Sequence, residues 1–545
     1  MAPQAPIERL PVELLSYIFI LGAHTPDPQD FDSESDATDG ERTREGHEPF
    51  GEDEQAISPC IFSSSTPPDV FAAVNRHWRE VALGTPKLWT RICVTIGDLQ
   101  HNTSDGGWFP AVSRYVSRSR RCPLDIYIDA RDPEWDFSED DMAGAVVSPY
   151  FDDSYGYVHP FRVEHVHYVL NILLPHVARI RSLAILTDRW APMQTALQCL
   201  SFQTSAFVSA PDPLPSGLPL LESLVLMRCN EFVSYHDRFS PHGQQGPAYL
   251  PFRGLLTASC DGERQPAALL PNLRQLVLSG VHLDWSSLPY LLPTPHDPDG
   301  IGLKRLELSY HSAEVRPDEQ QLRRILQKCQ SLRTLTVQVS GPHAPEASDT
   351  CRSADDAPPI ALPALKTLKL GYYDVQPAVA LLGMVDLGTV ENVALEYSYP
   401  GRDETLDGEP LLLACSAVTS TASSRYAQPV FPRARSVALR RVEASAETFK
   451  AFYAALPSLR ELSVAQMFLL GGESLMTRDV DLSFVPPEAT AHPFAPEPSA
   501  ANISEVFKSW TSVPEACASA TVGRTIIARP DASGYGFDRK HQKLC

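Results

Sequence analysis

Two groups of side chains have the residue types of a catalytic or metal-binding site. His165 and His167 form a His-Val-His run, which on a strand would place two imidazoles on one side, as a metal pair requires. The sequence suggests no third ligand near them. Acidic residues cluster at 139–141 and 152–153, without the oxygen-ligand loop of a calcium motif. We therefore expect two ordinary half-buried histidines and a solvated acidic loop here.

Motifs of other enzyme classes are also missing from the sequence. There is no GxSxG elbow, no P-loop, no GxGxxG turn and no HExxH motif. The eleven cysteines are odd in number and never spaced as CxxC, which argues against a disulfide framework or a zinc site. We predict a non-enzymatic protein without cofactor or metal, from a reducing compartment, the cytoplasm or the nucleus or both.

Composition limits the classes of partner. With 545 residues, 43% of them hydrophobic, the chain can bury a sizeable core. Its formal net charge of −21 argues against nonspecific binding to nucleic acid or to an anionic membrane. No apolar run approaches the roughly 20 residues of a membrane-spanning helix. Forty-nine prolines indicate many turns and few long helices. We expect a folded, soluble protein for most of the length.

Much of the negative charge lies in residues 27–55. This stretch is dense in Asp and Glu and has almost nothing apolar to bury. Such a segment cannot offset the entropy lost on ordering, so disorder is expected. Two interpretations stay open: a solvated loop, or a regulatory element that recognises charge.

The elements that would have to position any functional residue begin with a short helix in RLPVELLSYIFILGA, residues 9–23. Pro11 and Glu13 favour the start of the helix, and Gly22 is expected to end it. Two apolar faces follow from the helical period: Leu14, Ile18 and Leu21 on one, and Leu15 and Phe19 on the other. One face can pack on the protein's own core. The other predicts a partner, elsewhere in the chain or in another protein.

A second helix is predicted within residues 66–92, TPPDVFAAVNRHWREVALGTPKLWTRI. Thr66 or Asp69 can cap its start, and Gly-Thr-Pro at 84–86 ends it. Apolar residues recur at helical spacing and then in a short following segment: Val70, Val74, Trp78, Val81 or Ala82, and then Leu88 and Trp89.

Together the two stretches resemble the F-box of fungal F-box proteins. LPVELLSYIF (10–19) is similar to the LPxELLxxIF helix of that family, and VNRHWREVALGTPKLW (74–89) is similar to its second helix and TPxLW turn. The resemblance implies a small helical module, residues 1–95, that docks on the Skp-family adaptor of cullin-based ubiquitin ligases. It differs from the compact family pattern by an acidic insertion, residues 24–65.

The resemblance also implies a set of adaptor-binding residues, several of which must instead belong to the core of the module; Trp78 suits either role. The set is Leu10, Pro11, Leu14, Leu15, Ile18, Phe19, Val74, Trp78, Leu88 and Trp89.

From about residue 120 to residue 482 a short phrase with the frame Leu-x-x-Leu-x-Leu recurs. Its copies lie at 178–186, 218–226, 270–278, 302–308, 330–337, 362–370, 388–395, 431–439 and 456–464. This is the frame of a leucine-rich-repeat strand, whose alternate residues point into a shared core. Residues 319–329 and 446–456 have helical spacing, so some returns between strands are helices. We predict an α/β fold: the helical module, then an irregular leucine-rich-repeat solenoid with a curved parallel sheet.

The outward positions beside the leucines are the expected contacts to a target protein. Those selected are Gln275, Arg305, Glu307, Thr334, Thr336, Thr367, Lys369 and Asn392, and Val277 and Ala394 are also expected to face outward. Their chemistry is mixed and does not identify a target. Irregular inserts at 230–269, 341–361 and 398–430 are expected loops, and residues 483–545 are expected to be a proline-rich, mostly disordered tail.

These observations lead to one functional hypothesis and two alternatives. The chain is predicted to be the substrate-recognition subunit of an SCF-type ubiquitin ligase, in the ubiquitin conjugation pathway. The module would bind the Skp-family adaptor and through it the cullin core, and the repeats would bind an unknown protein target. The main alternative is a leucine-rich-repeat scaffold that recruits no ligase. An enzyme with an unrecognised site is the more distant one. Neither nucleic acid nor membrane is an expected partner.

Overall fold

The computed structural model describes residues 10–24, 68–100, 108–135, 158–203, 218–246, 248–253, 269–293, 302–343, 358–398, 408–419, 428–465, 468–469, 480–485 and 525–530. The acidic stretch 27–55 and the carboxylate clusters at 139–141 and 152–153 lie outside these ranges. By its internal contacts the chain divides into two compact units. Unit 1 comprises Met1–Asn230, Pro247–Val277 and Tyr290–Pro293, and unit 2 comprises Glu231–Gly246, Leu278–Pro289 and Thr294–Cys545.

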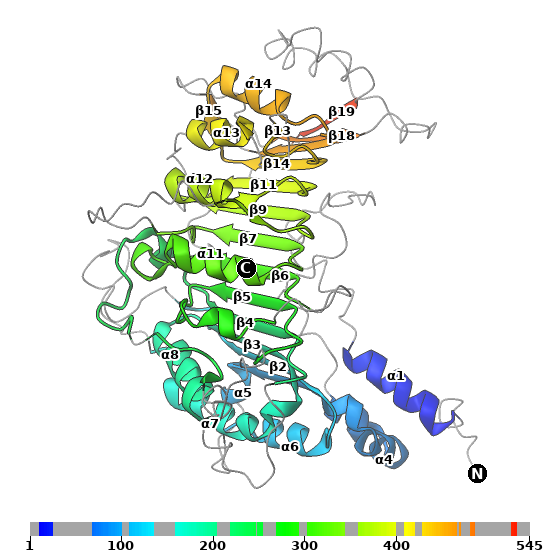
Figure 1. Ribbon diagram of the computed structural model, residues 1–545. Coiled ribbons are helices and arrows are strands. Elements are labelled where there is room, and N and C mark those ends of the chain that lie inside the picture. The colour runs from blue at the N-terminus through cyan, green and yellow to red at the C-terminus, as the bar shows by residue number, and fades with distance from the viewer. Residues whose placement is uncertain are drawn as a thin grey trace, which may run out of the picture. The chain divides into compact units, whose positions relative to one another are not determined.

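Most of the strands belong to one large parallel sheet, which confirms the α/β class. Eleven described strands are ordered as in the chain: β1, β2, β3, β4, β5, β6, β7, β9, β11, β14 and β16 (Figure 1). Their bounds are β1 (Arg91–Thr95), β2 (Leu124–Ala130), β3 (Ile180–Thr187), β4 (Ser223–Arg228), β5 (Gln275–Ser279), β6 (Arg305–Ser309), β7 (Thr334–Gln338), β9 (Thr367–Tyr372), β11 (Asn392–Tyr397), β14 (Ser436–Arg440) and β16 (Glu461–Ala465).

All nine predicted copies of the repeat phrase contain one of these strands, from β3 to β16. The predicted register also holds in unit 2, where Leu368 lies beside Leu335 and Val393 and all three are buried. β1 and β2 were not predicted, because neither has the Leu-x-x-Leu-x-Leu frame. β1 pairs in parallel with β2, so the sheet begins at Arg91, well before residue 120.

The helices of unit 1 fall into two groups. The N-terminal ones are α1 (Val12–His24), α3 (Pro68–Val74), α4 (Arg76–Gly84) and the 3-10 turn η3 (Pro86–Trp89). Those between the first strands are α5 (Gly97–Gln100), α6 (Pro110–Arg118), α7 (Val163–Leu173), η5 (Leu174–Arg179), α8 (Trp190–Gln198) and the π-helical turn η6 (Cys199–Gln203).

Helices also connect the strands of unit 2: α11 (Glu319–Lys328), α12 (Val375–Met384), α13 (Glu409–Ser416) and α14 (Ala446–Ala454). α11 and α14 confirm the two helical returns expected from the sequence. Short 3-10 turns are η7 (Glu231–Tyr235), η8 (Leu288–Tyr290, across the boundary of the units) and η9 (Ala313–Val315). Four pairs of minor strands complete the list: β8 (Ile360–Ala361) with β10 (Val385–Asp386), β12 (Val418–Thr419) with β13 (Gln428–Pro429), β15 (Glu443–Ala444) with β17 (Phe468–Leu469), and β18 (Val480–Val485) with β19 (Thr525–Pro530).

Two local expectations were wrong. α1 continues to His24, because Gly22 does not end the helix: a Cβ there would lie 3.1 Å from a ring carbon of Phe71, so glycine allows this close approach. The single helix expected after residue 66 is two, because the Asn75 side chain accepts the Trp78 N–H at 2.8 Å and caps α4. The antiparallel pair β18 and β19 overlaps the predicted tail at residues 483–485 and 525–530, and the expectation for the other tail residues lies outside the described ranges.

Candidate protein-docking surface

The first layer of the N-terminal module is an apolar core beneath α1. Leu15, Phe19 and Ala23 lie one turn apart on α1 and are buried, together with Val81, Ala82, Leu88 and Trp89. The Phe19 ring stacks on Phe71, with 4.7 Å between centroids, and contacts Trp78 at 4.9 Å. Burial on this scale holds α1 in one orientation on α3, α4 and η3.

Polar contacts fix the same arrangement at both ends of α1. Thr85 Oγ1 donates to Ser16 Oγ at 3.0 Å, and the Arg91 guanidinium donates to the His24 carbonyl at 2.8 Å. Beneath them the Trp89 indole N–H donates to the Ala82 carbonyl at 2.9 Å. Burial, followed by the charge of Arg91, lowers the pKa of His24. The face of α1 that points to the core is therefore fully occupied.

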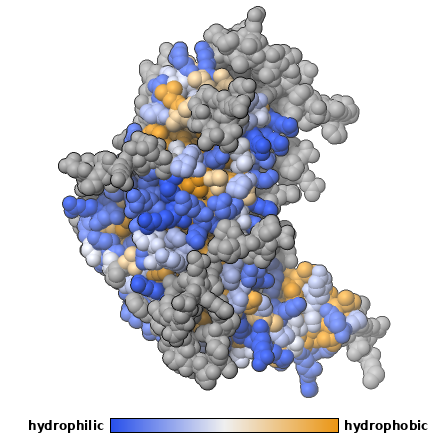
Figure 2. All heavy atoms as spheres, viewed as in Figure 1, coloured by the Kyte–Doolittle hydropathy of each residue, from blue (hydrophilic) through white to orange (hydrophobic). Residues whose placement is uncertain are grey.

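The opposite face of α1 is apolar and uncovered. Its members are Leu14 (52% exposed), Tyr17 (59%), Ile18 (44%) and Leu21 (46%), which follow one another at the i, i+3, i+4, i+7 spacing. We call these four residues the α1 face. Val70 and Val74 of α3 are also about half exposed. Figure 2 shows hydrophobic side chains gathered where Figure 1 places α1 and α4.

The structure sorts the ten predicted adaptor-binding residues. Leu14, Ile18, Val74 and Pro11 are exposed, and Leu10 is half-buried. The remaining expectations need correction, because four residues have no exposed surface from which to reach a partner: Leu15, Phe19, Leu88 and Trp89. These four are core residues, which resolves the two roles that the sequence left open for this set.

Two residues of the module remain: Trp78, the last of the ten predicted residues, and Tyr17, which the prediction did not include. Trp78 is half-buried against the core, and its Nε1 is buried with no acceptor among the described residues. Tyr17 belongs to the α1 face but was not selected from the sequence, since the family motif has a variable position there. Its place three residues after Leu14 is the signal that would have found it.

The predicted target-binding residues lie where strand alternation puts them, with exceptions. Seven are half-buried: Gln275, Arg305, Glu307, Thr334, Thr367, Lys369 and Asn392. Arg305 donates to Glu307 at 2.9 Å. Thr336 is only 4% exposed, so its side chain is not available as expected. Val277 was wrongly expected at the surface, because it packs in a buried cluster with Tyr127, Ala184, Leu186 and Val225.

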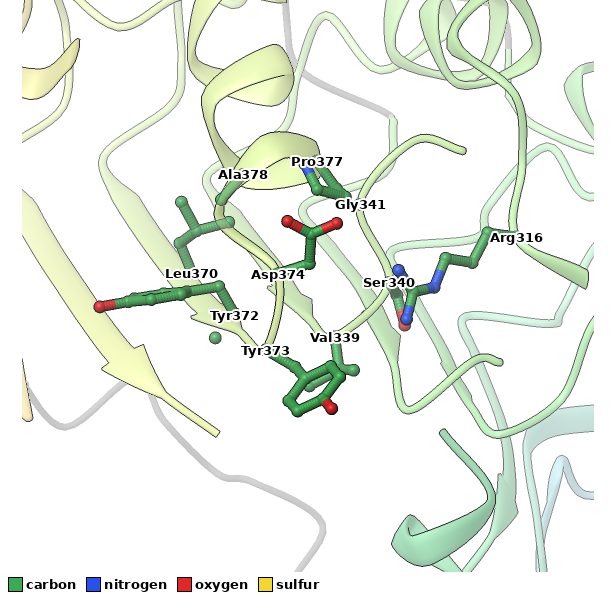
Figure 3. A pocket seen from close by; sticks show the side chains of 11 residues that line it. Arg316, Val339, Ser340, Gly341, Leu370, Tyr372, Tyr373, Asp374, Pro377 and Ala378 are labelled. Atoms are coloured by element: carbon green, nitrogen blue, oxygen red, sulfur yellow. The ribbon is translucent and has the colours of Figure 1, made fainter. Parts of the chain in front are cut away.

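Described residues line two cavities. The first, at the carboxyl ends of β7 and β9, has Arg316, Ser340 and Asp374 around it, but its volume of about 10 Å³ has room for no more than one water molecule (Figure 3). The second, in unit 1, is an open pocket of about 440 Å³ beside Trp108, Leu99 and the start of α7. Arg162 and Glu164 give its rim opposite charges, so it has no single charge preference.

His165 and His167, the two histidines singled out for chemistry, do not form a metal pair. His165 and His167 lie on α7 and not on a strand, so their side chains point in different directions. His165 Nδ1 accepts the Arg162 N–H, and His167 is hydrogen-bonded to Asn171. In the described ranges no group of three His, Cys, Asp or Glu side chains is placed to hold a metal ion.

The described cysteines are all free thiols, and most are poor nucleophiles. Burial raises the pKa of Cys93, Cys229, Cys329 and Cys415 to about 12, and that of Cys199 to about 11. At neutral pH these five remain protonated, and the thiolate is the reactive form.

No family model matches the chain, and no curated protein matches it significantly. Within the described part of the chain no helix has both the length and the apolar character needed to cross a membrane.

Proposed function

We propose that this chain is a substrate-recognition subunit of a cullin-based ubiquitin ligase, with the α1 face as the surface that binds the Skp-family adaptor. The observation that carries the proposal is the double apolarity of α1. One face fills the core through Leu15 and Phe19, and the other leaves Leu14, Tyr17, Ile18 and Leu21 in water.

The energetics favour a partner for this face. Fully burying a large apolar side chain contributes roughly 1.5–3 kcal/mol, and because each of these four is about half exposed, a partner would contribute roughly half of that for each. Single exposed apolar residues are common. Four of them on one face of a helix have the pattern of a helix that lies in an apolar groove of another protein. The sequence resemblance to the F-box, which covers both α1 and α4–η3, is what points to the adaptor as that protein.

The mechanism is proximity and needs no catalytic residue in this chain. The module holds the ligase, the strands and loops hold a target protein, and the effective concentration of the target near the ubiquitin-carrying enzyme rises. Ubiquitin transfer then takes place on other subunits.

The test is co-elution of the full-length chain with a recombinant Skp-family adaptor in size-exclusion chromatography. Leu14→Asp combined with Ile18→Asp should weaken binding at least about a hundredfold, because two buried side chains are replaced by carboxylates that would be desolvated. The matched control is Leu220→Asp combined with Leu413→Asp, at exposed apolar positions (39% and 50%) outside the module.

The control variant should co-elute like the wild type, and circular dichroism should be the same for all three proteins. Undiminished binding by the Leu14 and Ile18 variant would contradict the proposed surface. A wild-type chain that binds no adaptor would favour the scaffold alternative.

A further inference from the structure

A second surface lies at the amino-terminal ends of the strands of unit 2. The residue immediately before each of six strands is charged, and five of the six are basic. In chain order they are Lys304, Arg333, Lys366, Glu391, Arg435 and Arg460, which precede β6, β7, β9, β11, β14 and β16. We call this set the basic edge row.

Backbone hydrogen bonds hold the row in register. The N–H of Arg333 donates to the Lys304 carbonyl at 2.8 Å, and that of Lys366 to the Arg333 carbonyl at 2.9 Å. The same link joins Glu391 to Lys366, Arg435 to Glu391 and Arg460 to Arg435, at 2.7–2.8 Å. Since neighbouring strands are about 4.8 Å apart, the six positions span about 24 Å, the length of about seven extended residues.

Four of the six residues of the row are exposed. Arg333 and Arg460 are exposed, and the side chains of Lys366 and Arg435 are 61% and 57% exposed. Glu391 contacts these last two at 3.4 and 3.5 Å, so one carboxylate is shared between two cations.

The neighbouring positions add no negative charge to the centre of the row. The first residues of β7, β9, β11 and β14 are uncharged: Thr334, Thr367, Asn392 and Ser436. Arg433 is a further exposed cation two residues before Arg435. This positive edge contrasts with the net charge of −21 of the whole chain. An aligned set of cations on an acidic protein is a feature of surfaces that attract anionic partners selectively.

We propose that the basic edge row binds an extended anionic peptide, a segment of about seven residues with carboxylate or phosphate groups. The identification of this peptide as part of a ligase target rests on the proposed function, whereas the binding itself does not. Carboxylates and phosphates share the recognition chemistry of Lys and Arg, so the two sources are separated by experiment.

Binding is measured by fluorescence polarisation on the full-length chain with three labelled peptides of equal length. One alternates Gly with Glu, one alternates Gly with phosphoserine, and one alternates Gly with Gln. We expect both anionic peptides to bind and the Gln peptide not to bind. Raising the salt from about 0.05 M to about 0.5 M should weaken binding about tenfold or more, because the contacts are exposed. Tighter binding of phosphoserine would assign the target as a phosphoprotein.

The decisive variant is Arg333→Glu combined with Lys366→Glu, which should weaken anionic peptide binding at least about tenfold. The control, Arg324→Glu combined with Arg440→Glu, changes the net charge equally on α11 and at the carboxyl end of β14, and should bind as the wild type does. Equal losses in both variants, or none in either, would overturn the proposal.

Three further measurements separate this inference from the proposed function and decide the occupant. Adaptor co-elution should be unchanged in both charge variants, so a failure of this inference is distinguishable from a failure of the proposed function. A single-stranded oligonucleotide that binds more tightly than both anionic peptides would overturn the peptide assignment. So would a large gain in peptide affinity when residues 27–55 are replaced by a Gly/Ser linker, since that acidic segment would then be the natural occupant.

Discussion

In the strands of unit 2 the side chains that point away from the core are mostly polar, whereas the side chains of the α1 face are apolar. Leu368 on β9 is buried, and its neighbours Thr367 and Lys369 are half-buried and hydrated on their outer side. On α1 the buried Phe19 is preceded by Ile18, which is apolar and 44% exposed. A polar outer surface is stable in water without a partner, while an apolar helical face gains free energy only when something covers it.

The difference suggests two kinds of binding. Contacts to the α1 face depend on buried apolar area, so salt should affect them little and they suit a lasting assembly. Contacts to the basic edge row depend on exposed charge, so they weaken with salt and suit reversible capture of a target.

The comparison within α1 gives the largest expected effect. Phe19→Ala removes a ring that stacks on Phe71 and contacts Trp78, and should destabilise the module by about 3–5 kcal/mol. Leu14→Ala should change stability by no more than about 0.5 kcal/mol, because its side chain is half in water, but should weaken adaptor binding. Urea unfolding checks the first value. Similar losses of stability in both variants would show that the two faces are not distinct.

The same contrast applies to β9 with a smaller expected effect. Leu368→Ala should cost roughly 2–5 kcal/mol, because Leu368 is 1% exposed and packs in register with Leu335 and Val393. Thr367→Ala should cost about 0.5 kcal/mol or less, since its side chain faces outward. Thermal melting of both variants would refute the inside-outside register if they melt alike.

A buried histidine is expected to make the stability of unit 2 depend on pH. Burial lowers the pKa of His311 to about 3, and its ring is hydrogen-bonded to Ser340 Oγ (2.8 Å) and to the Val281 carbonyl (3.0 Å). His282 and Arg316 also oppose its protonation. The unfolded chain binds a proton near pH 6.5 that the folded chain does not, so stability is present above that pH and falls as the pH decreases towards 3.

The expected loss is at most about 1.4 kcal/mol per pH unit. His311→Gln, which keeps a donor near Val281, should remove this part of the pH dependence. The check is the urea midpoint at about pH 7.5 and about pH 5.5 in both proteins. An unchanged pH slope in the variant would show that His311 is not the responsible group.

The sequence predicted the repeating strands because alternate residues of a strand point into the core, and the leucine frame marks those buried positions. It did not predict β1 and β2, whose residues lack the frame, or the break at Asn75, where one side-chain hydrogen bond outweighs a continuous apolar period. It also missed the buried cluster that contains Val277 and Tyr127, since whether Val277 is covered depends on residues far away in the chain.

For the docking surface, the helical period identified two apolar faces but did not decide which one is internal. That choice depends on Phe71 and Trp78, which pack on Phe19 and leave Ile18 outside. The basic edge row was not predicted, because its residues lie just before the strands and not at the outward strand positions. Its signal is visible in the repeat itself, as Lys or Arg directly before the first strand residue in LeuLysArg, LeuArgThr, LeuLysThr, AlaArgSer and LeuArgGlu.

The most direct test of the central claim is hydroxyl-radical footprinting of the full-length chain with and without the Skp-family adaptor. The account predicts that oxidation of Leu14, Tyr17, Ile18 and Leu21 falls severalfold when the adaptor is added. Leu220 and Leu413, which are similarly exposed in the free chain, should be oxidised at the same rate in both samples. Unchanged oxidation of the α1 face in a sample where the adaptor is bound would contradict the account, because the adaptor would then be held by another surface.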